Sequence, residues 1–530
     1  MVTSAAPPLI ILAHSEIHLS GKQEGNREKI RKQAQWRKTV PEPLPMPKVR
    51  DVFPLTLLSL SAIIRSWICR EGFDSAASET DNIFFVHVPA GFDSSQHMRS
   101  ESPGNKGRRR EERYIMKNVV VGQSGGPTAV INSSIAGVYA GAKAAGAEHV
   151  YGMIHGIEGF LQDKLVDLDK YLADPMGIEL LKRTPSAFLG SCRFKMPKIE
   201  GHEDVYENVF KIMEEHDIDT LFYAGGNDSM DTVKMLSDYA KEHGKKELFM
   251  GVPKTIDNDL PVTDHCPGYG SAAKYIATTM KEVIRDNESF GAAKPTIVIA
   301  EIMGRDAGWL TAAAALAKGD DCSGVDAIYL PERVFDVDKF LDKVEHLSKT
   351  KRSVVIAVSE GLKLADGRYA CELGDASDKV DAFGHKQLSG TASALCKLVA
   401  DRTGCKTRAI EFSTMQRAAT HVASLTDIDE AFTAGKMAAE AAAQGETGEM
   451  VIFKRVNTEA EPYRIEFSKF DIHQIANGVK NVPQEWINED GDDLTEDYVK
   501  YARPLIQGEL LPFWVDGTPR HLVMEELKEF

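Results

Sequence analysis

The chain has 530 residues and a net charge of −16, with 43% hydrophobic and 27% charged residues. This composition is typical of a globular protein with a large core, and the length corresponds to about three or four domains. The acidic balance argues against nucleic acid as the main partner, because phosphate backbones favour Lys and Arg. The seven cysteines form no C-x-x-C pair, which argues against a zinc knuckle or a thioredoxin-type motif and favours a reducing cytoplasm.

Residues 1–115 differ from the rest of the chain. They hold 17 Lys and Arg against 13 Asp and Glu, so they carry +4 while the remaining residues carry −20. Their proline clusters and basic stretches show no sustained helical or strand period. The apolar run 53–68 is shorter than the ~20 residues of a membrane span, and it begins too far from Met1 for a signal peptide. We interpret this segment as a disordered or poorly packed extension and expect no membrane partner; a native start at Met116, where a strand pattern begins, is a further hypothesis.

Short apolar runs alternate with amphipathic stretches from residue 118 onward. Strands are predicted at 118–121, 221–224, 248–252, 296–302, 326–330, 353–358 and 407–412. Helices are predicted after the first two of these strands, and an alanine-rich helix after residue 305. This alternation predicts an α/β fold with a doubly wound, mostly parallel sheet covered on both faces. Ligands bind beyond the carboxyl ends of such strands, so the functional residues are expected in the loops there.

Two glycine-rich turns follow the first two predicted strands. Residues 122–128 (Gly-Gln-Ser-Gly-Gly-Pro-Thr) and 225–229 (Gly-Gly-Asn-Asp-Ser) each lead into a predicted helix. Glycines let the backbone approach an anion closely, and a helix N-terminus presents free N–H groups. Neither turn matches the P-loop or the dinucleotide-binding motif. Each is also compatible with an ordinary tight turn, in which Asn227 or Asp228 simply caps the next helix.

The loop at residues 253–259 (Pro-Lys-Thr-Ile-Asp-Asn-Asp) carries the most specific chemistry. It places a cation, a hydroxyl and two carboxylates at the end of a predicted buried strand. In an extended loop, Asp257 and Asp259 would lie on the same side, as alternating residues do. Phosphoryl transfer needs a group that accepts the proton of the attacking hydroxyl, a cation on the phosphates and a site for Mg²⁺. The loop supplies all three residue types, although a plain acidic surface turn has a similar composition.

Three arginines could bind an anionic substrate. Arg305 ends the run Met-Gly-Arg after a predicted strand, and Arg408 and Arg417 flank the run 409–416. A guanidinium forks onto a phosphate with two parallel hydrogen bonds. For each arginine alone, a surface ion pair is the more common role.

In these loops the chain resembles the phosphofructokinase family, from about residue 118 to beyond residue 417. The matching runs, in family order and spacing, are 125–126, 189–194 (Leu-Gly-Ser-Cys-Arg-Phe), 225–229, 253–259, 303–305, 359–360 (Ser-Glu) and 416–417 (Gln-Arg). The resemblance implies a fold of two three-layer α/β subdomains with the active site between them. It implies a catalytic core over residues 116–450, followed at 451–530 by a C-terminal continuation packed on that core.

The resemblance also implies a reaction and roles for individual residues. The reaction is phosphorylation of the 1-hydroxyl of fructose 6-phosphate, with Mg²⁺ as cofactor, in a homodimer or homotetramer. Asp257 would be the general base, and Asp259 with Asn227 would place the metal. The expected contacts to the sugar phosphate come from Thr255, Ile256, Asp257, Met303, Gly304, Arg305, Glu360, Thr414 and Arg417, with Arg408 reaching in from a neighbouring subunit. The expected contacts to the phosphoryl donor come from Gly125, through its N–H, and from Arg193, Lys254 and Thr255.

Two positions indicate pyrophosphate rather than ATP as the donor. Relatives that use ATP have glycine where this chain has Asp228 and Lys254. A carboxylate at Asp228 would meet the α-phosphate of ATP with like charge and bulk, whereas the ammonium of Lys254 could stabilise the leaving phosphate. Such transfer would be reversible, because pyrophosphate and phosphate are similar leaving partners.

Three departures from the family pattern affect substrate binding. Asn227 replaces a usual aspartate, Thr414 a usual histidine, and Thr296 an arginine that some relatives share between subunits. Another sugar, such as sedoheptulose 7-phosphate, therefore remains an alternative substrate. The alternatives for function are an ATP-dependent phosphofructokinase, a non-catalytic regulatory subunit that would be expected to lose the run 255–257, and an NAD or lipid kinase.

Overall fold

The computed structural model describes residues 116–290, 294–374, 388–458, 461–475 and 478–529. The predictions for residues 1–115 lie outside these ranges. Within these ranges, no helix has both the length and the apolar character that a membrane crossing requires.

The larger of two α/β sheets has seven strands, in the order β11-β10-β5-β4-β1-β2-β3. The strands are β1 Asn118–Gln123, β2 His149–Met153, β3 Leu165–Asp167, β4 Ile218–Gly225, β5 Leu248–Pro253, β10 Glu449–Arg455 and β11 Ile465–Asp471. The five strands from β10 to β2 are parallel, and the two edge strands, β3 and β11, run antiparallel to their neighbours. The carboxyl ends of β1, β4 and β5 are therefore adjacent.

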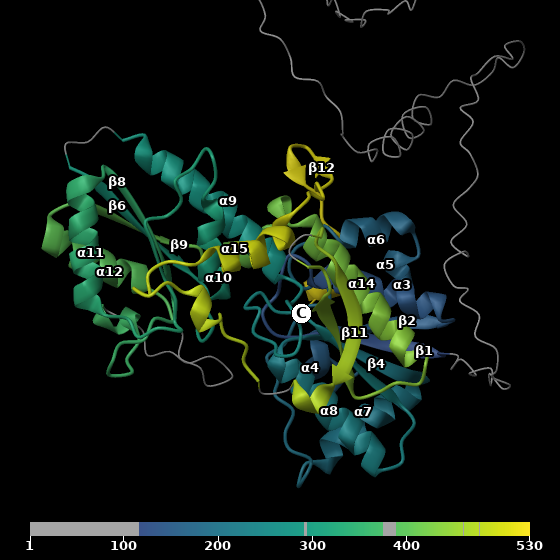
Figure 1. Ribbon diagram of the computed structural model, residues 1–530. Coiled ribbons are helices and arrows are strands. Elements are labelled where there is room, and N and C mark those ends of the chain that lie inside the picture. The colour runs from purple at the N-terminus through teal and green to yellow at the C-terminus, as the bar shows by residue number, and fades with distance from the viewer. Residues whose placement is uncertain (1–115, 291–293, 375–387, 459–460, 476–477, 530) are drawn as a thin grey trace, which may run out of the picture. The chain divides into compact units, whose positions relative to one another are not determined.

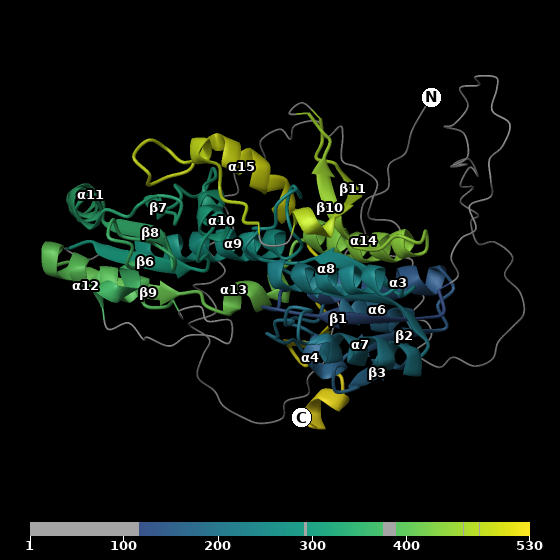
Figure 2. The ribbon, with the colours of Figure 1, turned by 90° about the horizontal axis from the view of Figure 1, so that it is seen from below.

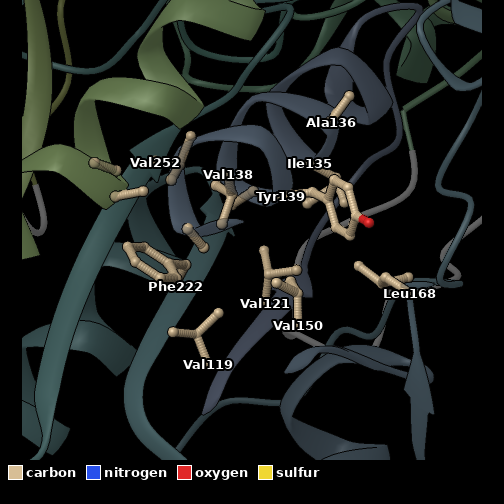
Figure 3. Close-up of a cluster of buried hydrophobic side chains, with 14 of the residues drawn as sticks. Val119, Val121, Ile135, Ala136, Val138, Tyr139, Val150, Leu168, Phe222 and Val252 are labelled. Atoms are coloured by element: carbon tan, nitrogen blue, oxygen red, sulfur yellow. The ribbon is translucent and has the colours of Figure 1, made fainter. Parts of the chain in front are cut away.

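Alternating residues of β1 supply the cores on the two faces of this sheet. Val119 and Val121 belong to one buried cluster, which includes Ile135 and Val138 of helix α3 (Ile131–Ala144). Figure 3 shows these valines below α3, beside Phe222 of β4. Val120 belongs to the cluster on the opposite face, against α7 (Glu203–Glu215) and α8 (Asn227–Glu242). Helices therefore cover both faces, and the predicted α/β fold is confirmed.

Helices α3 and α14 (Leu425–Ala442) pack together on one face of the larger sheet, as Figure 2 shows. Their backbones meet at two glycines. A Cβ on Gly137 would lie 1.9 Å from the carbonyl oxygen of Phe432, and one on Gly435 would lie 2.1 Å from that of Ser134. Such distances are far inside van der Waals contact, so any side chain at either position would force the helices apart.

The smaller sheet has four parallel strands in the order β7-β8-β6-β9. They are β6 Thr296–Ile302, β7 Ala327–Tyr329, β8 Ser353–Ser359 and β9 Lys406–Glu411. Helices α11 (Val337–Thr350) and α12 (Thr391–Thr403) pack on one face, and α9 (Tyr269–Glu288) packs on the other (Figure 1).

The predicted alanine-rich helix is shorter than expected. It consists of one α-helical turn, α10 (Trp309–Ala312), and a 3₁₀ turn (Ala313–Ala317). Most of these residues are fully buried in the same cluster as α9. Tertiary packing, rather than the helix propensity of alanine, sets their conformation.

The segment after α14 is part of both halves of the fold. Strands β10 and β11 extend the larger sheet, whereas Tyr498, Tyr501 and Ala502 of α15 (Glu496–Ala502) belong to the core of the smaller one. For this segment the sequence predicts a continuation packed on the core but no individual strand or helix.

A buried ion cluster joins the chain that follows β5 to α14 and the β10–β11 hairpin. His265 lies 2.8 Å from Asp264 through Nδ1 and 2.7 Å from Glu430 through Nε2. Arg455 pairs with Asp264 at 2.9 Å, and Tyr463 donates to Glu430 at 2.7 Å. Burial by itself lowers the pKa of His265, but Glu430 and Asp264 outweigh it and raise that pKa to about 9. The imidazole is therefore a cation held between two carboxylates.

This cluster predicts a loss of stability at alkaline pH. Because the folded pKa of His265 lies above the usual value of 6.5, its contribution is complete below about pH 6.5 and is lost as pH rises through 9. The expected loss is up to about 3 kcal/mol, since one unit of pKa corresponds to about 1.4 kcal/mol. Urea unfolding midpoints between pH 6 and pH 9.5 should fall for the wild type and for His202→Gln, an exposed control. They should fall less for His265→Gln, and equal slopes would contradict a charged His265.

Candidate active site

A cavity of about 500 Å³ opens at the carboxyl ends of strands from both sheets. The loops after β1, β4 and β5 line one side, and the loops after β6 and β8 line the other. Arg193, Arg417 and residues 478–479 complete the lining. The loops singled out in the sequence therefore meet in one place.

Backbone hydrogen bonds hold the turn after β1 against β4 and against the segment around Cys192. Ser124 donates its N–H to Ala224 of β4 at 2.9 Å, and Gly125 donates its N–H to Cys192 at 3.1 Å. The N–H of Gly125 was expected to bind donor phosphate, and in this structure it is already engaged. The carbonyl of Gly126 accepts a hydrogen bond of 2.8 Å from the ammonium of Lys254. This bond holds the lysine at the cavity wall between the turns after β1 and β5.

The turn after β4 contributes two polar side chains at the start of α8. Asp228 lies in the first turn of that helix, exposed and lining the cavity. Asn227 also lines the cavity, and its Oδ1 is buried with no hydrogen-bond partner among the described residues. A buried oxygen without a partner costs free energy unless water, an ion or a ligand satisfies it. Asn227 therefore presents an oxygen that could bind water, an ion or a ligand in the cavity.

The loop after β5 brings Asp257 and Asp259 to the cavity, but not in the predicted extended conformation. Asn258, between them, has a φ of 54°, in the left-handed region. Asparagine tolerates this region better than most residues. The hydroxyl of Thr255 accepts the N–H of Asp257 at 3.1 Å. The prediction that both carboxylates reach one site holds, whereas the alternation argument for it is wrong, because the chain turns sharply at Asn258.

The charged side chains of this loop shift one another's pKa values. Burial and the nearby Asp259 raise the pKa of Asp257 to about 7, against the opposing effect of Lys254. Burial likewise raises the pKa of Asp259. For Lys254, burial lowers the pKa to about 8, although both aspartates favour its charged form. Groups poised in this way are typical of sites for proton transfer.

The opposite wall carries the residues expected to bind sugar phosphate. The N–H of Gly304 lies 3.4 Å from Oε1 of Glu360, and the N–H of Met303 lies 3.3 Å from Oε1 of Gln416. Burial raises the pKa of Glu360 to about 7. The cations Arg305 and Arg417 line the same cavity. Burial, together with the like charge of Arg193, lowers the pKa of Arg417.

Residues 118–442 match the family model described as phosphofructokinase. The chain belongs to the phosphofructokinase family. The pyrophosphate–fructose 6-phosphate 1-phosphotransferase of Methylococcus capsulatus is 38% identical over 410 residues, which cover 77% of this chain and 96% of that protein. The protein of the same name from Xanthomonas campestris is 39% identical over 411 residues, with the same two coverages. The solved pyrophosphate-dependent phosphofructokinase of Nitrosospira multiformis aligns with a TM-score of 0.69 and 36% identity, covering 77% of this chain and 97% of that one.

Three of the residues expected from the family pattern, Arg408, Thr414 and Gly304, do not line the cavity. Arg408, on β9, pairs with Asp286 at 3.4 Å, and its guanidinium lies 5.1 Å from the centre of the Phe290 ring. Thr414 is exposed at the start of the helical turn Met415–Ala418. The N–H of Gly304 lies 3.4 Å from Oε1 of Glu360, and its carbonyl accepts a hydrogen bond from the hydroxyl of Ser359. The other expected residues all line the cavity, namely Gly125, Arg193, Asn227, Asp228, Lys254, Thr255, Ile256, Asp257, Asp259, Met303, Arg305, Glu360 and Arg417.

Sequence reasoning missed Gly478 and Val479, which line the cavity from the segment beyond the family match. No motif marks these residues, and they lie far along the chain from every other lining residue. Only the course of the folded chain brings them there.

A second group of possible metal ligands, His149, Asp167 and Asp169, lies among the described residues, with ligand atoms within 4.8 Å of one another. His149 and Asp167 contact each other at 2.8 Å, and Asp169 accepts hydrogen bonds from Tyr139 and Lys143. None of the three lines the cavity. This group is therefore separate from the expected metal ligands.

Proposed function

We propose that this protein transfers a phosphoryl group from pyrophosphate to the 1-hydroxyl of fructose 6-phosphate. The products are fructose 1,6-bisphosphate and phosphate, and the transfer is reversible, as a step of glycolysis. The observation that carries the proposal is the pair Asp228 and Lys254 at the wall of one cavity. The names of the relatives from Methylococcus and Xanthomonas support the same donor and acceptor.

In this proposal, the donor pyrophosphate binds against Lys254, Arg193 and the turn after β1. The bond from Lys254 to Gly126 fixes the ammonium where it meets the phosphate that departs. Asp228 lines the cavity at the position where the family pattern would place the α-phosphate of ATP, and its carboxylate would repel that phosphate. The cations attract the short, highly charged pyrophosphate.

The acceptor hydroxyl loses its proton to Asp257. The hydroxyl oxygen forms a bond to the nearer phosphorus while the bridging phosphorus–oxygen bond of pyrophosphate breaks, and the leaving phosphate takes the electron pair. Burial raises the pKa of Asp257 to about 7, which makes the carboxylate a stronger base than a free aspartate. Lys254 stabilises the charge on the leaving phosphate, and Thr255 contacts the transferring group.

Asn227 and Asp259 fit a Mg²⁺ site. Mg²⁺ binds hard oxygen ligands. Asp259 supplies a carboxylate, and Oδ1 of Asn227 is buried without a partner among the described residues. When bound, Mg²⁺ would neutralise negative charge on the phosphate oxygens.

Sugar binding is assigned to the opposite wall. Glu360 and the backbone of Met303 and Gly304 orient the sugar, and Arg305 and Arg417 bind its charged groups. Arg408 would reach the 6-phosphate from a neighbouring subunit, so we also propose a homodimer or homotetramer, and Thr414 is proposed as a contact of the 6-phosphate within the same chain. We also propose a cytoplasmic location, which the scattered single cysteines of the sequence favour. We further propose residues 116–450 as the catalytic core and 451–530 as its continuation.

The test is a comparison of initial rates with fructose 6-phosphate and Mg²⁺, using pyrophosphate or ATP as donor. We expect turnover with pyrophosphate and none with ATP. The double variant Asp228→Gly/Lys254→Gly should gain measurable turnover with ATP and lose it with pyrophosphate. Turnover of the wild type with ATP would contradict the assignment of these two side chains. Inactivity with both donors would favour another sugar, with sedoheptulose 7-phosphate as the first candidate, or a regulatory subunit.

A further inference from the structure

Residues 480–482 connect the loop that carries Asp257 with the loop that carries the sugar-binding residues. Lys480 donates its N–H to the carbonyl of Asp259 at 2.8 Å. Its own carbonyl accepts a hydrogen bond of 2.7 Å from the indole of Trp309, just beyond the loop after β6. Two residues later, Val482 donates to Glu332 at 3.0 Å, and the same carboxylate oxygen accepts the N–H of Gly308 at 2.8 Å.

The side chain of Lys480 contacts the segment after β5 that carries Asp257 and Asp259, which we call the base loop (residues 254–264). Its ammonium donates to the carbonyls of Asp264 at 2.8 Å and Thr263 at 3.1 Å, and lies 3.4 Å from Oδ1 of Asn258. These three acceptors belong to one stretch of chain that begins between the two aspartates. The ammonium also lies 5.3 Å from the centre of the Trp309 ring, within the range of a cation–π contact.

Asn258 needs this support because its backbone is in the left-handed region, with φ of 54°. Its Nδ2 donates to the hydroxyl of Tyr501 at 2.8 Å, and its Oδ1 accepts the N–H of Cys266 at 2.9 Å. Tyr501, like Lys480, comes from the segment beyond the family match, which ends at residue 442. The unusual turn that presents Asp257 and Asp259 is therefore held in part by residues outside the segment that the family model covers.

We propose that Lys480 is a positioning residue for phosphoryl transfer. It holds the base loop against the sugar loop, which is the loop after β6 that carries Met303, Gly304 and Arg305, and it does not touch substrate. This inference rests on the proposed function. Reacting groups must be aligned closely, and a displacement of about 1 Å can cost roughly 10²-fold in rate. Loss of Lys480 leaves the substrate-binding side chains in place but lets Asp257 move, so it lowers kcat more than it changes either KM.

The test compares Lys480→Met, Lys480→Arg and the control Lys182→Met, using kcat, both KM values and the melting temperature. Lys182 is a similarly enclosed lysine that pairs with Glu179 outside the cavity. Lys480→Met should lower kcat roughly 10²-fold with both KM values nearly unchanged, and Lys480→Arg should recover part of that loss. Lys182→Met should keep the wild-type kcat.

A wild-type kcat in soluble Lys480→Met, or a loss confined to KM or melting temperature, would overturn the positioning role. If Lys480→Met fails to fold, Trp309→Phe provides the test, because it removes the indole N–H that donates to the carbonyl of Lys480 and keeps an aromatic ring at the buried position. It should lower kcat by about tenfold, the order expected for one net hydrogen bond to this segment, and an unchanged kcat would overturn the proposal. A wild type inactive with pyrophosphate would instead overturn the proposed function.

Discussion

The Asp257→Ala variant is expected to lose turnover with pyrophosphate while it still binds fructose 6-phosphate. A positioned general base contributes about 10²–10⁴-fold to a rate. Among the described residues, no other carboxylate occupies the position of Asp257 in the turn at Asn258. Asp259, the nearest acid, is assigned to the metal. In the proposed function the sugar phosphate binds to the opposite wall, so its affinity should change little. Steady-state rates and calorimetric titration of fructose 6-phosphate measure the two effects separately.

The comparison with Asp257→Asn separates the base from the space that it fills. The amide keeps the size of the carboxylate and cannot accept the proton, so both variants should be inactive to a similar degree. Activity of either variant within a few-fold of wild type would contradict the base assignment. Loss of sugar binding in both would indicate that Asp257 anchors substrate rather than removing its proton.

Replacing Lys254 by glycine or methionine should lower the rate with pyrophosphate by roughly 10²-fold or more, the scale expected for loss of one electrostatic stabiliser in an enclosed site. The ammonium is buried and held by the carbonyl of Gly126 at 2.8 Å. Methionine keeps most of the volume of lysine, so the two variants together separate charge from packing. The measurement is the initial rate in both directions of the reaction, because the same cation should act on phosphate in each.

Lys182→Met again serves as the control for removing an enclosed lysine. It should retain the rate of the wild type, whereas Lys254→Met should not. A negligible effect of both Lys254 variants would mean that other groups hold the donor, with Arg193 as the first candidate because it also lines the cavity. A loss in the glycine variant alone would indicate that the side chain acts by filling space.

The site was predictable to the extent that its residues lie in strand-end loops. Lys254, Asp257 and Asp259 follow one buried strand, and Asp228 follows its neighbour, so a parallel sheet places them side by side. The local conformation was less predictable, since the turn at Asn258 depends on Tyr501, Cys266 and Lys480. The hydrogen bond from the N–H of Gly125 to the carbonyl of Cys192 was likewise not predictable, because it joins two separate segments of the chain.

The sequence by itself determined the α/β class, the seven predicted strands and the family, because hydrophobic periodicity and short motifs are local properties of the chain. The tertiary structure alone decided which distant segments complete the cavity. Gly478, Val479 and Lys480 carry no motif and reach the base loop only because the chain beyond α14 packs on both sheets. Contacts of this kind depend on the packing of whole elements, and their free energy is divided among many residues, so no short run of sequence encodes them.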